Sequence, residues 1–400
     1  MKKLFFIAAI AGAALVSCTK NELAPSATEQ HEITFASPVA STVTKTTLIP
    51  SDYPTTESFS VYADYHKDVY ASTATNAFTS YMRGDEGVAV THKTVTIPNT
   101  SFDSYWSADT KYYWPMDGHL TFAAYSPTAV NGFAEISYDI VNGVKITDFE
   151  IKTDTQYDLM LSDRTVNQKK GNMGANVGKN PANSAMEYDG VSIKFNHVLS
   201  AIKFGIQTAA DYKTTDGYTI TLNSLTIKNA YSQGDLKQFV SKDATTVDLA
   251  NVWSNVDTPN TKGYTVTSTP VELSTTIRTF TDDKHADWVM LPQVLDHGDN
   301  DVEIEIAYSV SHKDMGIKET DANGNTVYNS IPYTKSLSLA GTGTTADGSD
   351  EDPDAITVNS WLAGNRYIYT IIIGMEEIVF APTVVAPWTD VNVNVPESSI

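Results

Sequence analysis

The sequence predicts an all-β fold of two antiparallel β-sandwich domains, and three observations lead to this prediction. Apolar and polar residues alternate with a period of two over many short stretches, as in half-buried strands. These stretches are rich in β-branched and aromatic residues and end at Gly, Asn, Asp or Pro. No stretch has the spacing of a long amphipathic helix, and many short antiparallel strands usually pack as sandwiches.

Chain length indicates two domains. The chain has 400 residues, of which 41% are hydrophobic, and one core rarely serves more than about 250 to 300 residues. An irregular segment rich in Gly and Asn, residues 164–190, separates two strand-rich halves, so we place the boundary near residue 188. The predicted organisation is a signal peptide at 1–17, a tether at 18–30, an N-terminal β-sandwich domain at 31–187 and a C-terminal β-sandwich domain at 188–400.

The strand-like stretches place their apolar residues on one face. In "HEITFAS", residues 31–37, Ile33 and Phe35 alternate with polar residues, and "FSVYADY", residues 59–65, repeats the pattern. In "EISYDIVNGVKI" the pair Asn142-Gly143 predicts a β-hairpin, because both residues tolerate the positive φ angles of a type I′ turn. The second half continues with "VSIKF", "YTITLNSLTI", "VEIEIAYSV", "RYIYTIII" and "DVNVNV".

The N-terminus predicts export. Lys2 and Lys3 precede thirteen apolar residues, 4–16, and this run is shorter than the about 20 residues that span a bilayer as a helix. The run ends in Leu-Val-Ser before Cys18, which resembles the bacterial lipobox, in which the cysteine is acylated and becomes the first residue of the mature chain. The alternative is a chance cysteine beside an ordinary cleavage site.

The charge excludes some partners. The chain has 48 acidic and 27 basic residues, and loss of two lysines with the signal peptide leaves 25 basic residues and a net charge of 25 − 48 = −23. Such a charge repels nucleic acid and anionic lipid headgroups. No later apolar run is long enough to span a membrane, so lipid at Cys18 is the predicted anchor.

No pattern marks a catalytic or metal site. Cys18 is the only cysteine, which excludes a disulfide framework or a thiolate nucleophile. No histidine has a second histidine three to five residues away, as zinc sites commonly require. The acidic clusters at 296–303 and 347–354 lack the ligand spacing of an EF-hand loop, so solvated charge is favoured over structural calcium. We expect no enzyme activity, no cofactor and no metal.

An aromatic segment, residues 104–127, has two interpretations. Trp106, Tyr113 and Trp114 belong to a dense group of rings that could form a platform for stacking of sugar rings in glycan binding or adhesion. Aromatic side chains also fill the cores of β-sandwiches, where each buries about 150 to 250 Å². We favour packing and keep the platform as the alternative.

Several motifs, taken in order, resemble one family. Together with the lipobox they resemble the Mfa-like fimbrillin family, the subunits of type V pili in Gram-negative anaerobes. The resemblance covers nearly the whole mature chain, and the ordered set is more specific than any single piece. The motifs are "ITF", "TVTKTT", "YYWPMDGHLTFAAYSP", "YDLMLS", "VSIKFNHVLSAIKFGI", "WVMLPQ" and "WLAGNRYIYTIII".

The resemblance implies two sandwich domains of transthyretin-like topology and a structural function. It also implies an outer-membrane lipoprotein precursor, from which a trypsin-like protease removes an N-terminal strand. The groove so opened accepts a donor strand of another subunit, commonly its C-terminal segment. The implied partners are other fimbrial subunits, the outer membrane through the lipid, and host or bacterial surface ligands. The implied location is the cell surface, and the fimbrium after assembly.

This sequence has a candidate for each part of that exchange. "HEITFAS" is the candidate removable strand, and Lys45 is the candidate processing site because it lies between that strand and the next. The candidate donor strand is residues 384–400, in which Val391, Val393 and Val395 point one way as pocket fillers. The alternative for this tail is a final strand of its own domain.

The sequence departs from the family pattern at the expected cleavage residue, and one other function competes with that of a fimbrial subunit. Many members are cut after arginine, yet the first arginine is Arg83, beyond two predicted strands. An uncleaved chain would stay lipid-bound as an anchor, and a tip subunit is a further option. The alternative function is a surface glycan-binding lipoprotein of a polysaccharide-uptake system, with Trp106, Tyr113 or Trp114 as stacking rings.

Overall fold

A computed structural model describes most of the chain between residues 32 and 387. Regular structure in this part of the chain is nearly all β-strand, in several mainly antiparallel sheets, so the predicted all-β fold is confirmed. The described ranges are 32–40, 53–70, 77–94, 104–132, 135–152, 156–169, 190–259, 263–280, 287–298, 300–345, 355–375, 377–381 and 383–387.

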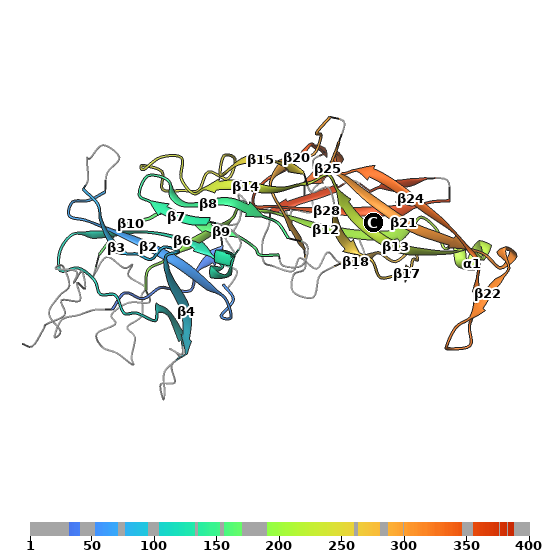
Figure 1. Cartoon of the computed structure of the whole chain (residues 1–400), viewed down its shortest axis with the longest axis horizontal. Coiled ribbons are helices and arrows are strands. Elements are labelled where there is room, and N and C mark those ends of the chain that lie inside the picture. The colour runs from blue at the N-terminus through green and yellow to red at the C-terminus, as the bar shows by residue number, and fades with distance from the viewer. Residues whose placement is uncertain are drawn as a thin grey trace, which may run out of the picture.

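A nine-stranded sheet forms one end of an elongated molecule (Figure 1). Its main path runs β1-β11-β9-β6-β2-β4-β5, with β10 paired to β6 and β3 to β2. The strands are β1 Val39–Ala40, β2 Ser58–His66, β3 Thr79–Met82, β4 Val88–Thr94, β5 Ser104–Ala108, β6 His119–Ser126, β9 Met160–Ser162, β10 Thr165–Gln168 and β11 Lys194–His197.

A four-stranded sheet in the order β15-β14-β8-β7 lies along the upper side of the molecule in Figure 1. It is built from two hairpins that are far apart in the sequence, and β14 pairs with β8 in antiparallel fashion. The strands are β7 Glu135–Asp139, β8 Gly143–Glu150, β14 Tyr231–Lys237 and β15 Trp253–Pro259.

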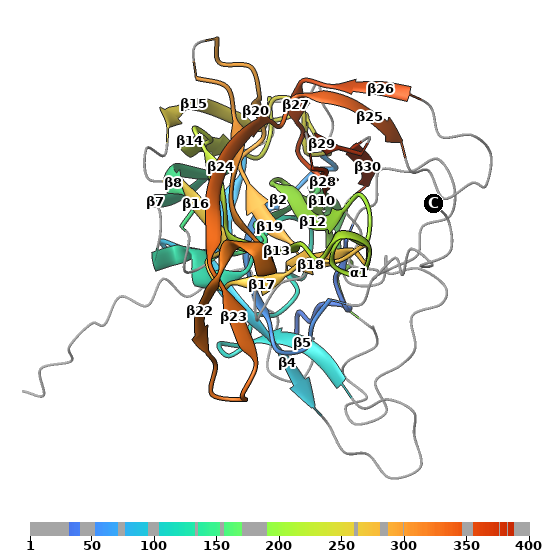
Figure 2. The same ribbon diagram turned by 90° about the vertical axis from the view of Figure 1, so that its right-hand side faces the viewer.

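Two larger sheets form the other end of the molecule, which faces the viewer in Figure 2. The five-stranded sheet contains β13 Thr219–Lys228, β16 Tyr264–Thr267, β17 Val271–Glu272, β21 Glu303–Ser311 and β24 Ser330–Ser338. The eight-stranded sheet contains β12 Ser200–Thr208, β18 Arg278–Phe280, β19 Trp288–Met290, β25 Gly341–Thr345, β26 Ala355–Val358, β28 Asn365–Ile373, β29 Ile378–Phe380 and β30 Thr383–Pro387.

The remaining elements are short. Within the described ranges the helical elements have three to five residues each, in agreement with the absence of an amphipathic pattern. No helix of the described residues is long and apolar enough to cross a membrane. These elements are β20 Gln293–Val294, β27 Ser360–Trp361, β22 Ile317–Thr320, β23 Thr326–Tyr328, α1 Tyr212–Asp216 and the 3-10 helices η1 Thr128–Gly132 and η2 Lys313–Met315.

Alternate residues of a strand enter two different hydrophobic cores. Along β2, Phe59, Val61 and Ala63 enter one core, which we call the N-terminal core. Tyr62, which lies between them, enters the other, which we call the larger core. The larger core extends under the four-stranded sheet and through the two C-terminal sheets. The nine-stranded sheet is therefore covered on both faces, which explains why its central strands are buried along nearly their whole length, including polar residues such as Asp64.

The predicted hairpin is present, but its turn differs from the prediction. β7 and β8 pair in antiparallel fashion from Asp139 and Gly143 onward, so the loop has three residues and not two. Gly143 has a φ of 70°, while the Asp139 carboxylate accepts from the backbone N–H groups of Val141 and Asn142 at 2.9 and 2.8 Å. A side-chain cap thus replaces the type I′ geometry.

Strands on either side of residue 188 share sheets. β11 belongs to the nine-stranded sheet, and β14 pairs with β8 of the first half. The division at residue 188 and the transthyretin-like topology stay predictions.

Candidate functional site

Residues 32–40, which we call the closing strand, include β1. They lie between β5 on one side and, on the other, β11 with the chain that leads into it. On one side, Phe35 forms an antiparallel bridge with Trp106 of β5. On the other side, Phe35 forms a parallel bridge with Val191, and β1, the end of the closing strand, runs parallel to β11. We call the space between β5 and the chain leading into β11 the seam, and the closing strand fills it.

Backbone hydrogen bonds hold the closing strand to both sides of the seam. Towards β5, Phe35 N–H donates to Trp106 O at 2.8 Å and Trp106 N–H donates back to Phe35 O at 3.3 Å, while Ile33 N–H donates to Tyr112 O at 2.7 Å. Towards β11, Ala36 N–H donates to Val191 O at 3.0 Å and Val191 N–H donates to Thr34 O at 2.7 Å. Without this segment, groups on both edges would lose their partners.

Two side chains of the closing strand enter the N-terminal core. Ile33 is 3% exposed and Phe35 is fully buried, as expected for alternate residues of a strand. The Phe35 ring meets Phe59 and Phe122 edge-on, with ring centroids 5.6 and 5.9 Å apart. Phe35 therefore occupies a pocket with aromatic walls in the middle of the core.

An ion pair lies at the start of the closing strand. The Lys111 ammonium lies 2.8 Å from the Glu32 carboxylate, and this hydrogen bond raises the pKa of Lys111. Lys111 is largely exposed, so the pair adds at most a small amount to stability, on the order of 0 to 1 kcal/mol. It does place a positive charge at one end of the seam.

Gly190 makes the close approach of the closing strand possible. Its φ of 103° suits glycine, and a Cβ there would lie 2.3 Å from Phe35 C and 2.6 Å from Ala36 N. The backbone of the closing strand thus passes directly over a residue without a side chain. The glycine-rich composition of this region was visible in the sequence, but the need for glycine at this position comes from the packing.

We expect Gly190→Ala to weaken the attachment of the closing strand by at least about 2 kcal/mol, because it adds a backbone clash to conformational strain. Hydrogen exchange of the Phe35 and Ala36 amides measures the effect. Gly324→Ala is the matched control, since Gly324 also has a positive φ, 83°, but no atom within 4 Å of an added Cβ. Equal exchange in the two variants would show that the contact at Gly190 does not hold the strand.

The chain is anchored again at Tyr53, soon after the closing strand. Tyr53 is 6% exposed, stacks on Phe195 with centroids 5.8 Å apart and hydrogen-bonds through its hydroxyl to Ser126 Oγ at 2.6 Å. Burial raises the pKa of its phenol. The predicted processing residue Lys45 lies between Ala40 and Tyr53, outside the described residues.

The aromatic residues singled out in the sequence mostly belong to the core. Trp106 and Trp114 are each 2% exposed and lie in the N-terminal core, whereas Tyr113 is half-buried. Trp106 packs edge-on against Tyr53 with centroids 5.2 Å apart. Both indole rings therefore pack inside the core, and neither presents an open face for sugar stacking in the folded chain.

The predicted donor segment is described only at its start. Residues 384–387 belong to β30, which pairs antiparallel to β28 and parallel to β25 within the same chain. Val391, Val393 and Val395, like Cys18 at the other end of the sequence, lie outside the described residues. Their roles stay predictions.

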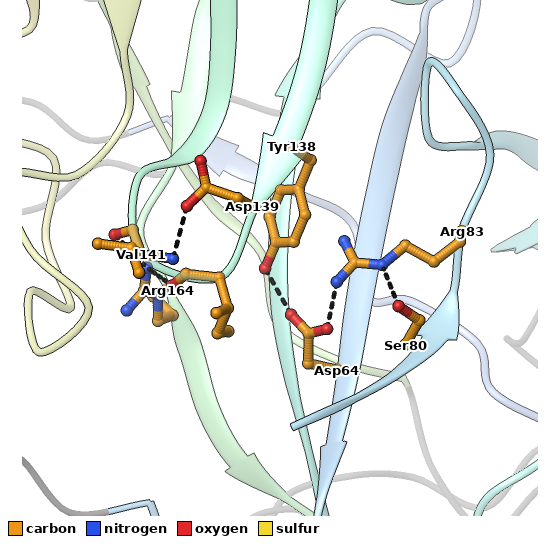
Figure 3. A network of polar contacts seen from close by, with 8 residues as sticks. Asp64, Ser80, Arg83, Tyr138, Asp139, Val141 and Arg164 are labelled. Carbon is orange, nitrogen blue, oxygen red and sulfur yellow. Dashed lines mark hydrogen bonds and ion pairs between the residues drawn. The ribbon is translucent and has the colours of Figure 1, made fainter. Parts of the chain in front are cut away.

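A buried polar network joins the nine-stranded sheet to the four-stranded sheet (Figure 3). Asp64 of β2 is 1% exposed, and its carboxylate accepts from the Arg83 guanidinium and, at 2.7 Å, from the hydroxyl of Tyr138 in β7. The guanidinium lies 4.1 Å from the centroid of the Tyr138 ring and 5.8 Å from that of the Tyr62 ring, and these two rings stack with centroids 4.4 Å apart. One buried carboxylate thus accepts from two donors that lie on separate segments of the chain.

Burial has the largest effect on the pKa values of Asp64 and Tyr138. It raises the pKa of Asp64 above its usual value, and Arg83 only partly opposes this rise. Burial and the neighbouring Asp64 charge raise the pKa of Tyr138. Asp64 lies 74 residues from Tyr138 in the sequence, and no local motif marks either residue, so sequence reasoning did not find the network. Among the described residues, no group of three or more His, Cys, Asp or Glu side chains is placed to hold a metal ion.

Comparison with known proteins identifies the family to which the chain belongs. The family model described as "Fimbrillin-like" matches residues 63–388, and no curated protein sequence matches the chain. The chain therefore belongs to the fimbrillin-like family. This family is structural and adhesive, so the protein is a cell-surface pilus subunit and not an enzyme.

Solved structures from the same group of proteins are similar to this chain. A fimbrial protein from Bacteroides vulgatus ATCC 8482 has 15% identity and a TM-score of 0.49, over 90% of this chain and 100% of that chain. A putative cell adhesion protein from Bacteroides uniformis ATCC 8492 has 15% identity and a TM-score of 0.39, over 91% and 100%. A fimbrilin from Porphyromonas gingivalis W83 has 11% identity and a TM-score of 0.38, over 90% and 99%.

Proposed function

We propose that the protein is a fimbrial subunit that is exported as an outer-membrane lipoprotein acylated at Cys18 and assembles by strand exchange. In this proposal, proteolysis at Lys45 separates the closing strand from the rest of the chain, and a strand of another subunit takes its place in the seam. The observation that carries the proposal is the position of the closing strand, which is the shared partner of both sides of the seam.

The physical basis is the complementarity of an empty seam and an incoming strand. Loss of the closing strand would expose unpaired backbone groups on two sheet edges, which readily accept another strand. It would also empty the sites of Ile33 and Phe35, and burial of one such side chain contributes about 1.5–3 kcal/mol. A donor with apolar residues at alternate positions would satisfy both requirements.

The contacts on either side of Lys45 support cleavage between Ala40 and Tyr53. The buried Tyr53 keeps the new N-terminal part of the cut chain attached to the core. Arg83, the first arginine, follows β3 and is engaged with the buried Asp64, so a cut there would divide the nine-stranded sheet. A lysine in the 41–52 interval is therefore the better candidate for processing.

The expected result for Lys45→Ala is that the chain keeps its N-terminal segment, stays bound to the membrane and does not enter filaments. Lys67→Ala is the control, because Lys67 is another exposed lysine, just after β2. N-terminal sequencing of surface material and electron microscopy measure the outcome. Wild-type filaments are expected to contain a chain that begins at Thr46. Normal filaments from the Lys45→Ala chain would contradict the proposed processing site.

A further inference from the structure

Two histidines face each other at the end of the β2–β6 pair. His66 is the last residue of β2 and His119 is the first of β6, and the two lie directly opposite in the antiparallel ladder. Their rings stack with centroids 5.6 Å apart and an angle of 14° between the planes. Both strands lie near one end of the molecule (Figure 1). A pair of titratable rings is thus packed within the nine-stranded sheet.

The hydrogen bonds of His66 fit a neutral ring. The residue is fully buried, and its Nδ1 lies 2.7 Å from Asp68 O. A carbonyl oxygen can only accept, so Nδ1 carries the hydrogen and donates. Nε2 lies 2.8 Å from Thr121 Oγ1 and therefore accepts from this hydroxyl. A proton on Nε2 would set two donors against each other unless the buried Thr121 hydroxyl turned round.

The charges around His66 also oppose its protonation. The His119 ring lies against it, and His119 Nδ1 is buried without a hydrogen-bond partner among the described residues. Asp64, on the same face of β2, is a nearby negative charge, but it is already paired with Arg83. Burial has the largest effect and lowers the pKa of His66; the bond to Asp68 O opposes this effect, His119 adds to it and Asp64 opposes it.

Other elements bring further charged or titratable groups close to His66. The Tyr70 ring meets the His66 ring edge-on with centroids 6.1 Å apart, and Arg164 donates to the Tyr70 hydroxyl at 3.1 Å. Together the groups from the surrounding elements are Asp64 of β2, the exposed Lys67 and Asp68, Tyr70, Arg83 after β3, His119 of β6 and Arg164 before β10. A positive charge on the buried His66 ring is therefore unfavourable.

The turn that follows β2, residues 67–70, covers the His66 ring. It is attached to that ring at Asp68 O. It is also attached to β10, because Tyr70 N–H donates to Asn167 Oδ1 at 2.6 Å and Asn167 Nδ2 donates to Tyr70 O at 3.2 Å. The His66 side chain can reach water only if this turn separates from its partners.

We propose that His66 is an acid-sensitive latch for the turn at residues 67–70. With a neutral ring, the turn is closed onto the His66 ring and β10. When Nε2 takes up a proton from the solvent, the charged ring leaves its buried site and the turn separates from β10, while both cores stay folded. The latch is independent of strand exchange. Because the protein is a cell-surface pilus subunit, the pH of its surroundings acts on the latch directly.

The direction of the pH dependence follows from the two states of His66. In the open turn the ring is in water with a pKa of about 6.5, whereas burial keeps its pKa lower in the closed turn. The closed state thus binds fewer protons between the two values. Closure is fully stable above about pH 6.5 and is lost as the pH falls toward the pKa of the closed state. Opening takes up one proton, so its equilibrium constant rises by at most about tenfold per pH unit.

Hydrogen exchange of the Tyr70 amide tests the latch, because this N–H donates to Asn167 in the closed turn. Protection factors, which correct for the intrinsic pH dependence of exchange, are measured on the mature chain from about pH 7.5 to about pH 5. We expect the factor for Tyr70 to fall by about tenfold below pH 6.5, while the factor for Phe35 in the closing strand stays constant.

Two variants connect this response to His66. His66→Gln keeps one neutral donor and one acceptor and is expected to remove the pH dependence at Tyr70. His297→Gln is the matched control and is expected to keep it, since His297 lies after β20 and contacts Val294 O. Asp64 titrates in all three chains, so its effect cancels in the comparison. A Tyr70 protection factor that is constant with pH, an equal fall in the His66→Gln chain, or an equal fall at Phe35 would overturn the latch.

Titration of the wild-type chain by NMR gives a second measurement that needs no substitution. The His66 ring is expected to titrate with an apparent pKa below about 6.5, over the same pH range in which the Tyr70 amide loses protection. Titration of this ring at or above that value, or without any change at Tyr70, would overturn the proposal.

Discussion

Phe35→Ala is expected to lower the free energy of unfolding of the N-terminal core by about 3–5 kcal/mol, the cost of deleting a buried phenyl ring. Phe35 is fully buried and meets both Phe59 and Phe122 edge-on, so the surrounding rings cannot close the cavity without losing their own contacts. Urea denaturation followed by tryptophan fluorescence measures the change, because Trp106 and Trp114 lie in the same core.

Two controls define this prediction. Met116→Ala should change the free energy of unfolding by less than about 0.5 kcal/mol, because Met116 is 74% exposed. Phe35→Leu should cost less than Phe35→Ala, since it keeps part of the buried volume. A loss below about 1 kcal/mol for Phe35→Ala would mean that the closing strand contributes little to the core, and the energetic basis for strand exchange would be lost.

Arg83→Ala is expected to destabilise the folded chain by about 2–3 kcal/mol at neutral pH. Removing one partner of a fully buried pair costs about 3–5 kcal/mol, because the other charge stays buried and unpaired. The Arg83 side chain is 29% exposed, which reduces that figure through solvent screening. Asp64 would keep the Tyr138 hydroxyl as a donor but lose its positive neighbour.

The destabilisation by Arg83→Ala should depend on pH in a defined direction. Burial already raises the pKa of Asp64 above its unfolded value, so its contribution to stability is most favourable below the unfolded pKa and is lost as pH rises through the folded pKa. Loss of Arg83 raises the folded pKa further. The difference from wild type should therefore be largest at neutral pH and shrink on acidification.

Denaturation of both proteins from pH 4 to pH 7 measures this trend. Lys93→Ala is the control, because its partner Asp109 is 87% exposed and such pairs contribute about 0 to 1 kcal/mol. A penalty for Arg83→Ala that is constant over this range, or that grows at low pH, would contradict the assignment of Asp64 as the buried charge.

The strands and their inward faces followed from local pattern. Alternation placed Ile33, Phe35 and Phe59 on inward faces, and all three lie in the N-terminal core. The hairpin at 135–146 was also correct, although Asp139 caps a three-residue loop where a two-residue turn was predicted. Composition alone left the role of Trp106 open, because a dense aromatic segment fits both a core and a binding surface.

The relations between distant segments did not follow from local pattern. Nothing near Asp64 indicates Arg83 or Tyr138 as partners, since these residues come together only when two sheets pack.

The sequence by itself determined the all-β class, the family and the inward faces of the strands, because alternation and motif order are properties of neighbouring residues. Tertiary structure alone decided that residues 32–40 lie between β5 and β11 and that Gly190 must lack a side chain there. The physical reason is that strand pairing depends on hydrogen bonds and packing between residues far apart in the chain, such as Phe35, Trp106 and Val191.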